Sequence, residues 1–183
     1  MAGATGVLGR PLVRALSAAG HQVTGTTRTP AKLATIESDG GAGVVCDALD
    51  REAVHRGIAA AQPEVVVHQL TDLPDSYAKL RKGSPETNRL RTDGTRHLVD
   101  AAVAAGARRV IAESIAFLYE PSGPPVVDEA APVWPSTPPP FGDMLAAVCA
   151  LERTVTTTPG IEGVVLRYGA STGPERGSRP TAI

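Results

Sequence analysis

Gly3, Gly6 and Gly9 follow one another at intervals of three residues, directly before a segment with helical spacing of apolar residues. A tight turn from a strand into a helix needs positive φ angles, which glycine adopts at little cost. Glycine has no Cβ, so it also lets a phosphate approach the free N–H groups at the start of a helix. The spacing therefore predicts a turn that binds the pyrophosphate of a nucleotide.

Polar residues at the ends of the next expected strands could extend this site. Arg28 ends the strand expected over 21–28, where an acidic residue would bind the ribose hydroxyls of NAD. An arginine there favours the 2′-phosphate of NADP, so we expect NADP in preference to NAD. The alternative is an ordinary surface arginine. Asp47 follows the strand expected over 44–46, and could contact an adenine amino group or cap a turn.

Strands and helices alternate along the whole chain. Helical spacing of apolar residues predicts the helices, and short β-branched runs predict the strands. This alternation predicts a single α/β domain over residues 1–183, built on a doubly wound parallel sheet. The helices are expected over 10–19, 30–38, 51–61, 86–105 and 141–156, and the strands over 21–28, 44–46, 64–70, 108–112 and 163–167.

The first strand of this sheet is largely missing from the sequence. Only Met1 and Ala2 precede the first glycine, although such a turn normally follows a buried strand. The first strand is central in this kind of sheet, so we expect its loss to leave a gap with unpaired backbone groups. We therefore expect further residues upstream of Met1 in the natural protein.

These features resemble the NAD(P)-dependent epimerase/dehydratase family, an extended or atypical branch of the short-chain dehydrogenase/reductases. The resemblance implies a Rossmann fold and covers nearly the whole chain. It rests on the glycine run 3–9, Arg28, Asp47 and the segments 65–68, 94–95 and 166–174. The cofactor-binding residues that it implies are Gly3, Thr5, Gly6, Val7, Leu8 and Gly9 at the pyrophosphate, Arg28 at the adenosine phosphate, Asp47 and Ala48 at the adenine, and Leu70 and Thr71 at the nicotinamide.

The catalytic residues of the family are only partly matched. The family uses a tyrosine, a lysine four positions later, and a serine or threonine at the end of the preceding strand. The phenol moves a proton, and the ammonium lowers the pKa of that phenol. Phe141 and Leu145 occupy the tyrosine and lysine positions here, and neither can transfer a proton.

Two other residues are candidates for catalysis. Ser114 falls near the family's serine, although alignment on Tyr119 would put Ile115 there. Tyr119 matches a loop tyrosine that is usually structural and could be recruited as an acid. Glu113 and Asp143 are further titratable residues near the expected pocket, and we expect both to be solvated.

Composition excludes several classes of protein. The net charge of -1 and the scattered arginines do not suit a nucleic-acid partner. No apolar run is long enough to cross a membrane and no signal peptide is evident, so a cytoplasmic location is expected.

Cys46 and Cys149 have no metal-like spacing and are interpreted as small buried apolar residues; no metal site is predicted. His68 is expected to be a core residue bonded to backbone.

The sequence predicts an NAD(P)-binding oxidoreductase, epimerase or dehydratase that acts on a sugar nucleotide or on a small carbonyl or hydroxyl substrate. The alternative is a non-catalytic NADP-binding sensor or regulatory protein without the Tyr-Lys pair, and an incomplete Rossmann domain without a function of its own is a third hypothesis. The resemblance also implies a C-terminal substrate region that is mostly absent before Ile183, and a homodimer through the helices expected over 86–105 and 141–156.

Overall fold

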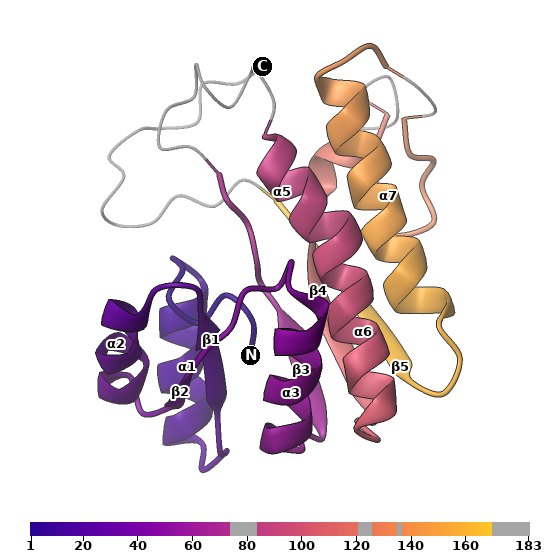
Figure 1. The fold of residues 1–183 in the computed structure, drawn as a ribbon. Helices are drawn as coiled ribbons and strands as arrows, with labels where there is room; N and C mark the ends of the chain where they lie inside the picture. Colours follow the sequence, from indigo (N-terminus) through magenta and orange to yellow (C-terminus); the bar gives the residue numbers. More distant parts are fainter. Residues whose placement is uncertain (74–83, 121–125, 135–136, 170–183) are drawn as a thin grey trace.

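All the strands that can be described pair in parallel, as predicted (Figure 1). The computed structural model describes residues 1–73, 84–120, 126–134 and 137–169. Its strands form a two-stranded sheet in the order β1-β2 and a three-stranded sheet in the order β3-β4-β5. The strands are β1 (Thr24–Thr27), β2 (Ala42–Val45), β3 (Val65–His68), β4 (Arg109–Ile115) and β5 (Glu162–Tyr168).

Ala2 joins these two sheets. It forms parallel bridges with Thr26 of β1 and with His68 of β3. Its N–H donates to the carbonyl of Val67 at 2.8 Å, and its own carbonyl accepts from the N–H of Gln69 at 2.9 Å. The shortened first strand thus closes the expected gap at this one residue, and the order across the molecule is that of a doubly wound sheet.

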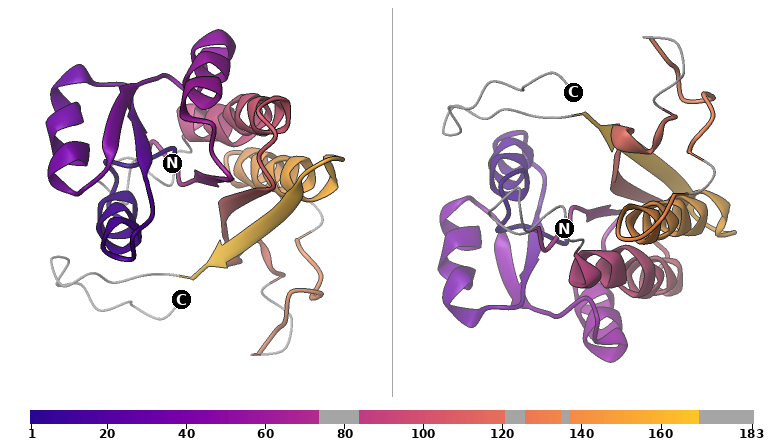
Figure 2. Two further views of the ribbon diagram at one scale, coloured as in Figure 1. Left: turned by 90° about the horizontal axis from the view of Figure 1, so that it is seen from below. Right: turned by 90° about the horizontal axis from the view of Figure 1, so that it is seen from above.

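Helices cover both faces of the sheet (Figures 1 and 2). In the two views of Figure 2, α1 and α2 lie on one side of the strands, and α3, α6 and α7 lie on the other. Asp50 begins α3 by accepting a hydrogen bond from the N–H of Ala53 at 3.0 Å. The helices are α1 (Gly9–Ala18), α2 (Leu33–Ser38), α3 (Arg51–Ala61), α5 (Pro85–Arg89), α6 (Thr95–Ala104) and α7 (Phe141–Thr157).

The main core lies between the three-stranded sheet and the helices α6 and α7. Alternate residues of the strands, such as Val66 and Val110, are buried against side chains such as Leu98, Leu151 and Val155. Because both faces of these strands are covered, short runs of valine and alanine bury enough apolar surface to form the strands, although the chain has few aromatic residues.

Two elements differ from their predicted form. The helix expected over 86–105 is interrupted by a π-helical turn, η2 (Leu90–Gly94), which joins α5 to α6. The strand expected over 108–112 continues to Ile115 and is followed by a 3-10 turn, η3 (Ala116–Leu118). Ser114 therefore belongs to a strand rather than to the loop expected over 114–140, and Glu113 also lies in this strand. Parts of that loop and of the one expected over 71–85 lie outside the described residues.

Candidate functional site

The glycine turn packs directly on the end of β3. Gly3 has a φ of 87°, and a Cβ on it would lie 2.4 Å from the carbonyl oxygen of Gln69. A Cβ on Gly9 would lie 2.0 Å from the carbonyl oxygen of Gly3. The N–H of Gly6 donates to that same oxygen at 3.0 Å. Only glycine can occupy the first and last of these positions without moving the backbone.

The turn presents an uncapped helix start. No side chain caps α1 at Leu8, and Val7 is 79% exposed. The free N–H groups of such a helix start attract an anion. Beside the turn, the side-chain oxygen of Gln69 is buried without a hydrogen-bond partner. The uncapped start of α1 suits the pyrophosphate of a nicotinamide dinucleotide. The unpaired side-chain oxygen of Gln69 suits a polar group of the same molecule.

The residues expected at the adenosine end lie after β1 and β2. Arg28 follows β1, and its guanidinium lies 3.5 Å from a carboxylate oxygen of Asp72, with both side chains about half exposed. Asp47 accepts a hydrogen bond from the N–H of Leu49 at 2.9 Å and so caps a turn, as the structural alternative predicted. The carbonyl of the buried Ala48 is 3.0 Å from Nδ1 of His97.

At the nicotinamide end, a buried histidine holds the backbone of Leu70. Nδ1 of His68 accepts from the N–H of Leu70 at 3.2 Å, so Nε2 carries the proton and faces Oγ1 of Thr95 at 3.0 Å. That hydroxyl in turn lies 3.4 Å from the carbonyl of Leu90 in η2. Burial, with a smaller effect of the charge on Arg91, lowers the pKa of His68 to about 4. The prediction that His68 is a core residue bonded to backbone is confirmed, and Thr95 is a partner that the sequence did not indicate.

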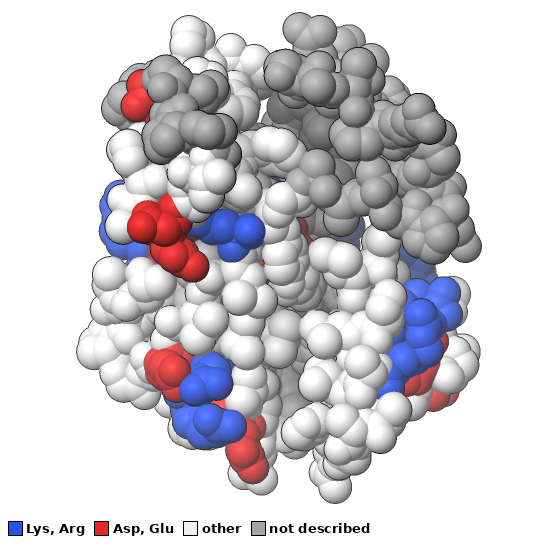
Figure 3. Space-filling view, turned by 180° about the vertical axis from the view of Figure 1, so that it is seen from behind, with Lys and Arg blue, Asp and Glu red and all other residues white. Residues whose placement is uncertain are grey.

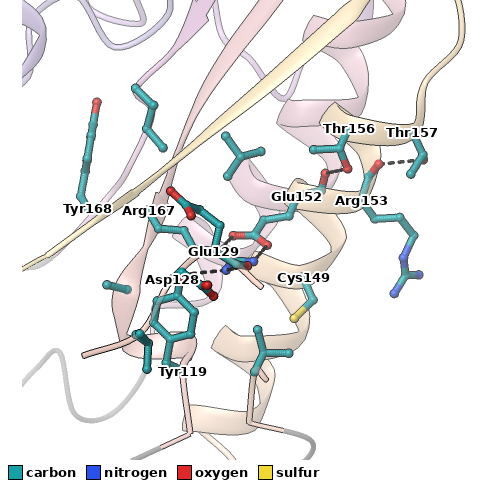
Figure 4. Close-up of a pocket in the computed structure, with 15 residues that line it drawn as sticks. Tyr119, Asp128, Glu129, Cys149, Glu152, Arg153, Thr156, Thr157, Arg167 and Tyr168 are labelled. Carbon is teal, nitrogen blue, oxygen red and sulfur yellow. Dashed lines mark hydrogen bonds and ion pairs between the residues drawn. The ribbon is translucent and has the colours of Figure 1, made fainter. Parts of the chain in front are cut away.

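Ser114 and Tyr119 meet in one hydrogen-bond network, in which Arg167 and Glu152 are the central pair (Figure 4 shows Tyr119, Glu152 and Arg167). Ser114 is 1% exposed, and its hydroxyl donates to Glu152 of α7 at 2.6 Å. Arg167 of β5 donates to both carboxylate oxygens of Glu152, at 2.9 and 2.7 Å, and to the hydroxyl of Tyr119 at 3.0 Å. The two predicted catalytic hydroxyls are thus both hydrogen-bonded to the Glu152–Arg167 ion pair.

This ion pair is held in its charged form. Burial raises the pKa of Glu152, but the hydrogen bonds from Arg167 and Ser114 outweigh burial and hold that pKa below its ordinary value. The hydrogen bond to Glu152 raises the pKa of Arg167. The guanidinium also lies 5.0 Å from the ring centroid of Tyr119. The network therefore ties β4, β5, α7 and the segment after η3 together.

An apolar cluster surrounds the positions of the family's tyrosine and lysine. Leu145, which stands in the lysine's place, is 4% exposed and packs with Leu118 and Val148. Phe141, in the tyrosine's place, lies edge-on to Trp134 with the ring centroids 5.1 Å apart. Neither place can hold a charged group without breaking this packing, so the cluster excludes the proton relay of the family.

Two charged residues near the strand ends differ from what the sequence predicted: Glu113 was placed incorrectly, and the burial of Arg91 was not predicted. Glu113 was expected at a solvated loop position; the loop is wrong, because Glu113 lies inside β4, where it is half-buried. Its burial raises its pKa, and the charge of Arg91 partly offsets this effect. Arg91 lies in η2 and is only 4% exposed. An arginine between apolar positions of a helix was its only signal in the sequence. Asp143 is exposed, as expected, although it lies in α7.

A pocket of about 990 Å³ opens between α7, β5 and the segment around Asp128 (Figure 4). The Glu152–Arg167 pair forms part of its wall, and the free Cys149 lies on the α7 side. Cys46 and Cys149 are both half-buried rather than buried as expected. The remaining lining residues include Asp128, Glu129, Arg153, Thr156 and Thr157.

The surface shows no broad region of one charge on the face seen in Figure 3, where basic side chains lie beside acidic ones in small clusters. Among the described residues, no three His, Cys, Asp or Glu side chains are grouped to hold a metal ion. None of the described helices has the length and apolar character needed to cross a membrane.

The parallel sheet, the glycine turn and the uncapped helix start define a dinucleotide-binding protein of the Rossmann class. The chain belongs to the NAD(P)H-binding family, whose model matches residues 3–181. It is 52% identical over 182 residues to a Streptomyces protein named 3-diazoavenalumate denitrifying reductase. That match covers 97% of this chain and 57% of the relative, so the chain spans little more than half of the relative's length.

Two solved structures are also similar. A putative epimerase from Burkholderia cenocepacia is 27% identical with a TM-score of 0.72, over 96% of this chain and 55% of that one. A short-chain dehydrogenase/reductase superfamily protein from Agrobacterium tumefaciens, solved with bound NAD, is 26% identical with a TM-score of 0.68, over 91% of this chain and 47% of that one. The predicted fold and the predicted family are confirmed, and a nicotinamide dinucleotide is the cofactor.

Proposed function

We propose that this protein is an NADPH-dependent reductase that removes nitrogen from a diazo-substituted carboxylate. The observation that carries the proposal is the 52% identity to a relative whose name describes reduction of a diazo compound with loss of nitrogen. The apolar cluster around Leu145 supports it, because this chemistry does not need the proton relay that the cluster displaces.

The proposed reaction balances without a protein acid. Bound NADPH would supply a hydride and become NADP⁺. At a carbon that bears a diazonium group, the C–N bond would break, N₂ would leave with the bonding electron pair, and the hydride would form the C–H bond. Reduction of a carbonyl differs, because the developing alkoxide must receive a proton. A site without the family's Tyr-Lys pair therefore suits the first reaction better than the second.

The chain's own residues have three tasks in this proposal. The turn from Gly3 to Gly9 and the start of α1 hold the pyrophosphate, and Arg28 binds the 2′-phosphate, which gives the preference for NADP. Leu70 and Thr71 line the nicotinamide, with the backbone of Leu70 fixed by His68. Ser114 and Tyr119 stay candidates for contact with substrate, and their hydrogen bonds to the Glu152–Arg167 pair support a positioning role.

The proposal is tested with the relative's own substrate. The protein is mixed with NADPH carrying deuterium at the transferable position and with 3-diazoavenalumate, and the product is analysed by mass spectrometry. We expect NADPH oxidation, N₂ release and deuterium at the carbon that carried the diazo group. Tyr119→Phe, which keeps the ring and removes the hydroxyl, should retain most of this activity, whereas a catalytic acid would lose about 100-fold or more.

Three outcomes contradict the proposal in different ways. Turnover of a sugar nucleotide or a small carbonyl compound, with no reaction of the diazo compound, would favour the substrates expected from the sequence. Tight NADPH binding without turnover of any of these compounds would favour the non-catalytic sensor. Failure to bind NADPH or NADP⁺ would overturn both.

A further inference from the structure

The side-chain amide of Gln69 makes only part of the hydrogen bonds that it can make. Gln69 is 7% exposed. Its side-chain nitrogen donates to the hydroxyl of Tyr168 at 3.2 Å, whereas its side-chain oxygen is buried and has no partner within the described part of the chain. A buried amide oxygen without a hydrogen bond is costly, so a ligand group that donates to it would be bound with a gain in free energy.

Two contacts place this amide beside the glycine turn. The N–H of Gln69 donates to the carbonyl of Ala2 at 2.9 Å. A Cβ on Gly3 would lie 3.2 Å from the Cβ of Gln69. The side chain of Gln69 therefore starts against the first glycine of the turn. Gln69 also directly precedes Leu70 and Thr71, which are expected at the nicotinamide.

Tyr168 reaches the same place from β5. The strand order is β3-β4-β5, so the hydrogen bond between Gln69 and Tyr168 crosses the end of β4. Arg167 is bonded to Glu152 of α7, and successive residues of a strand point to opposite faces, so Tyr168 points away from α7 (Figure 4). His68 faces α6, so Gln69, the next residue, points away from α6. Both side chains thus lie on the sheet face opposite to these helices, at the strand ends where open α/β sheets bind ligands.

The pair offers a ligand one acceptor and one donor. The unpaired oxygen of Gln69 is the acceptor. The hydroxyl of Tyr168 accepts from Gln69, and its own proton can be donated to a ligand. The carboxamide of a nicotinamide carries the complementary groups, because its amino group is a donor and its carbonyl oxygen is an acceptor. A phosphate offers only acceptors and does not match the pair.

We propose that Gln69 and Tyr168 together bind the nicotinamide carboxamide of the cofactor. The oxygen of Gln69 would accept from the amino group, and the hydroxyl of Tyr168 would donate to the carbonyl oxygen. Because the oxygen of Gln69 is buried, the side chains that cover it must shift as the cofactor binds. The carboxamide lies at one edge of the ring, so the pair would decide which face of the ring is turned to the substrate. This inference requires a nicotinamide dinucleotide at the glycine turn and is independent of the substrate.

Calorimetry with three nucleotides tests this proposal. NADP⁺ carries the carboxamide, its 3-acetylpyridine analogue has a methyl group in place of the amino group, and 2′-phospho-ADP-ribose has no pyridine ring. Wild type should bind NADP⁺ about 10-fold more tightly than the acetylpyridine analogue, because only NADP⁺ can donate to Gln69.

Two variants separate the two hydrogen bonds. Gln69→Met should weaken binding of NADP⁺ about 10-fold without weakening binding of the acetylpyridine analogue, so that the preference disappears. Tyr168→Phe should weaken binding of both about 5- to 10-fold, because both keep the carbonyl oxygen. Neither variant should change binding of 2′-phospho-ADP-ribose. Gln22→Met, which removes the amide of an exposed glutamine, is the matched control and should change nothing.

The inference is overturned if wild type binds NADP⁺ and the acetylpyridine analogue equally, if Gln69→Met weakens both to the same extent, or if Tyr168→Phe binds both as wild type does. Weaker binding of 2′-phospho-ADP-ribose in either variant would also overturn it, since the pair would then support the glycine turn instead. Should Gln69→Met fail to fold, the two nucleotides compared in wild type and in Tyr168→Phe still test the pair. Failure of the diazo compound to oxidise NADPH would contradict only the proposed reaction, because these binding measurements contain no substrate.

Discussion

At the scale of single residues, the proposed preference for NADP rests on Arg28. Its guanidinium is already 3.5 Å from Asp72, so a 2′-phosphate competes with a carboxylate for the same cation. We expect Arg28→Ala to weaken NADPH binding about 10- to 100-fold and to leave NADH binding unchanged, because only NADPH carries the 2′-phosphate. Calorimetry with both nucleotides measures this difference.

Asp72→Asn is the matched variant for this prediction. It removes the competing carboxylate but keeps the shape of the side chain, so NADPH should bind somewhat more tightly. Equal losses of NADPH and NADH in Arg28→Ala would show that Arg28 supports the fold rather than the phosphate.

The residues of the site differ in how far their roles follow from the sequence. Glycine spacing indicated the phosphate turn, because its conformational requirement is local. The partners of Ser114 and Tyr119 could not be predicted, since Glu152 and Arg167 come from α7 and β5. The position of Glu113 was predicted incorrectly for a similar reason. Glu113 pairs with Leu166 of β5, so β4 continues through a residue that was expected in a loop.

At the scale of elements, the close approach of α1 to the glycine turn depends on Gly9. A Cβ there would meet the carbonyl oxygen of Gly3 at 2.0 Å, so Gly9→Ala should reduce the free energy of unfolding by about 3 kcal/mol or more and abolish NADPH binding. Gly57→Ala in α3 is the control, since its added Cβ would lie 4.0 Å from the nearest atom, in the side chain of Val44. It should stabilise the protein by about 1 kcal/mol. Urea titrations compare the three proteins.

His68, which connects β3 to η2 through Thr95, should make the free energy of unfolding depend on pH. The unfolded chain protonates His68 near pH 6.5, whereas the folded protein does so only near its lowered pKa of about 4. The unfolded state therefore binds more protons between these values, and the free energy of unfolding falls as the pH is lowered through this window. The contribution of His68 is present above pH 6.5 and amounts to roughly 3 kcal/mol.

His68→Asn keeps an acceptor for the N–H of Leu70 but has no such titration. Chemical denaturation at several pH values should give this variant a shallower loss of stability between about pH 6.5 and 4 than wild type. His21→Asn changes an exposed histidine and should retain the wild-type slope. Identical slopes for His68→Asn and wild type would contradict the neutral state assigned to His68.

At the scale of the whole molecule, the cofactor should stabilise the fold. Within the described part of the chain, Ala2 bridges the two sheets by strand pairing, and the glycine turn that follows it is the expected binding site. NADPH at about 100 times its Kd should add about 2.7 kcal/mol to the free energy of unfolding. For a chain of this size, Tm should then rise by about 5–10 °C in a thermal scan. NADH at the same concentration should give a smaller rise, and equal shifts would contradict the preference for NADP.

The homodimer expected from the resemblance stays a prediction. In the described structure α6 and α7 pack against each other along one face of the sheet (Figure 1). Sedimentation of the protein in solution would measure its oligomeric state.

The alternation of strands and helices, the glycine turn and the expected absence of the family's tyrosine and lysine could all be read from the sequence alone. These features depend on local periodicity, on backbone conformation or on the identity of one residue. The fold was needed to show that Ala2 bridges the two sheets, that apolar side chains surround Leu145, and that the Glu152–Arg167 pair joins Ser114 to Tyr119. The reason is physical: burial and pairing of a polar group depend on segments that are far apart in the chain and that meet only when the sheet forms.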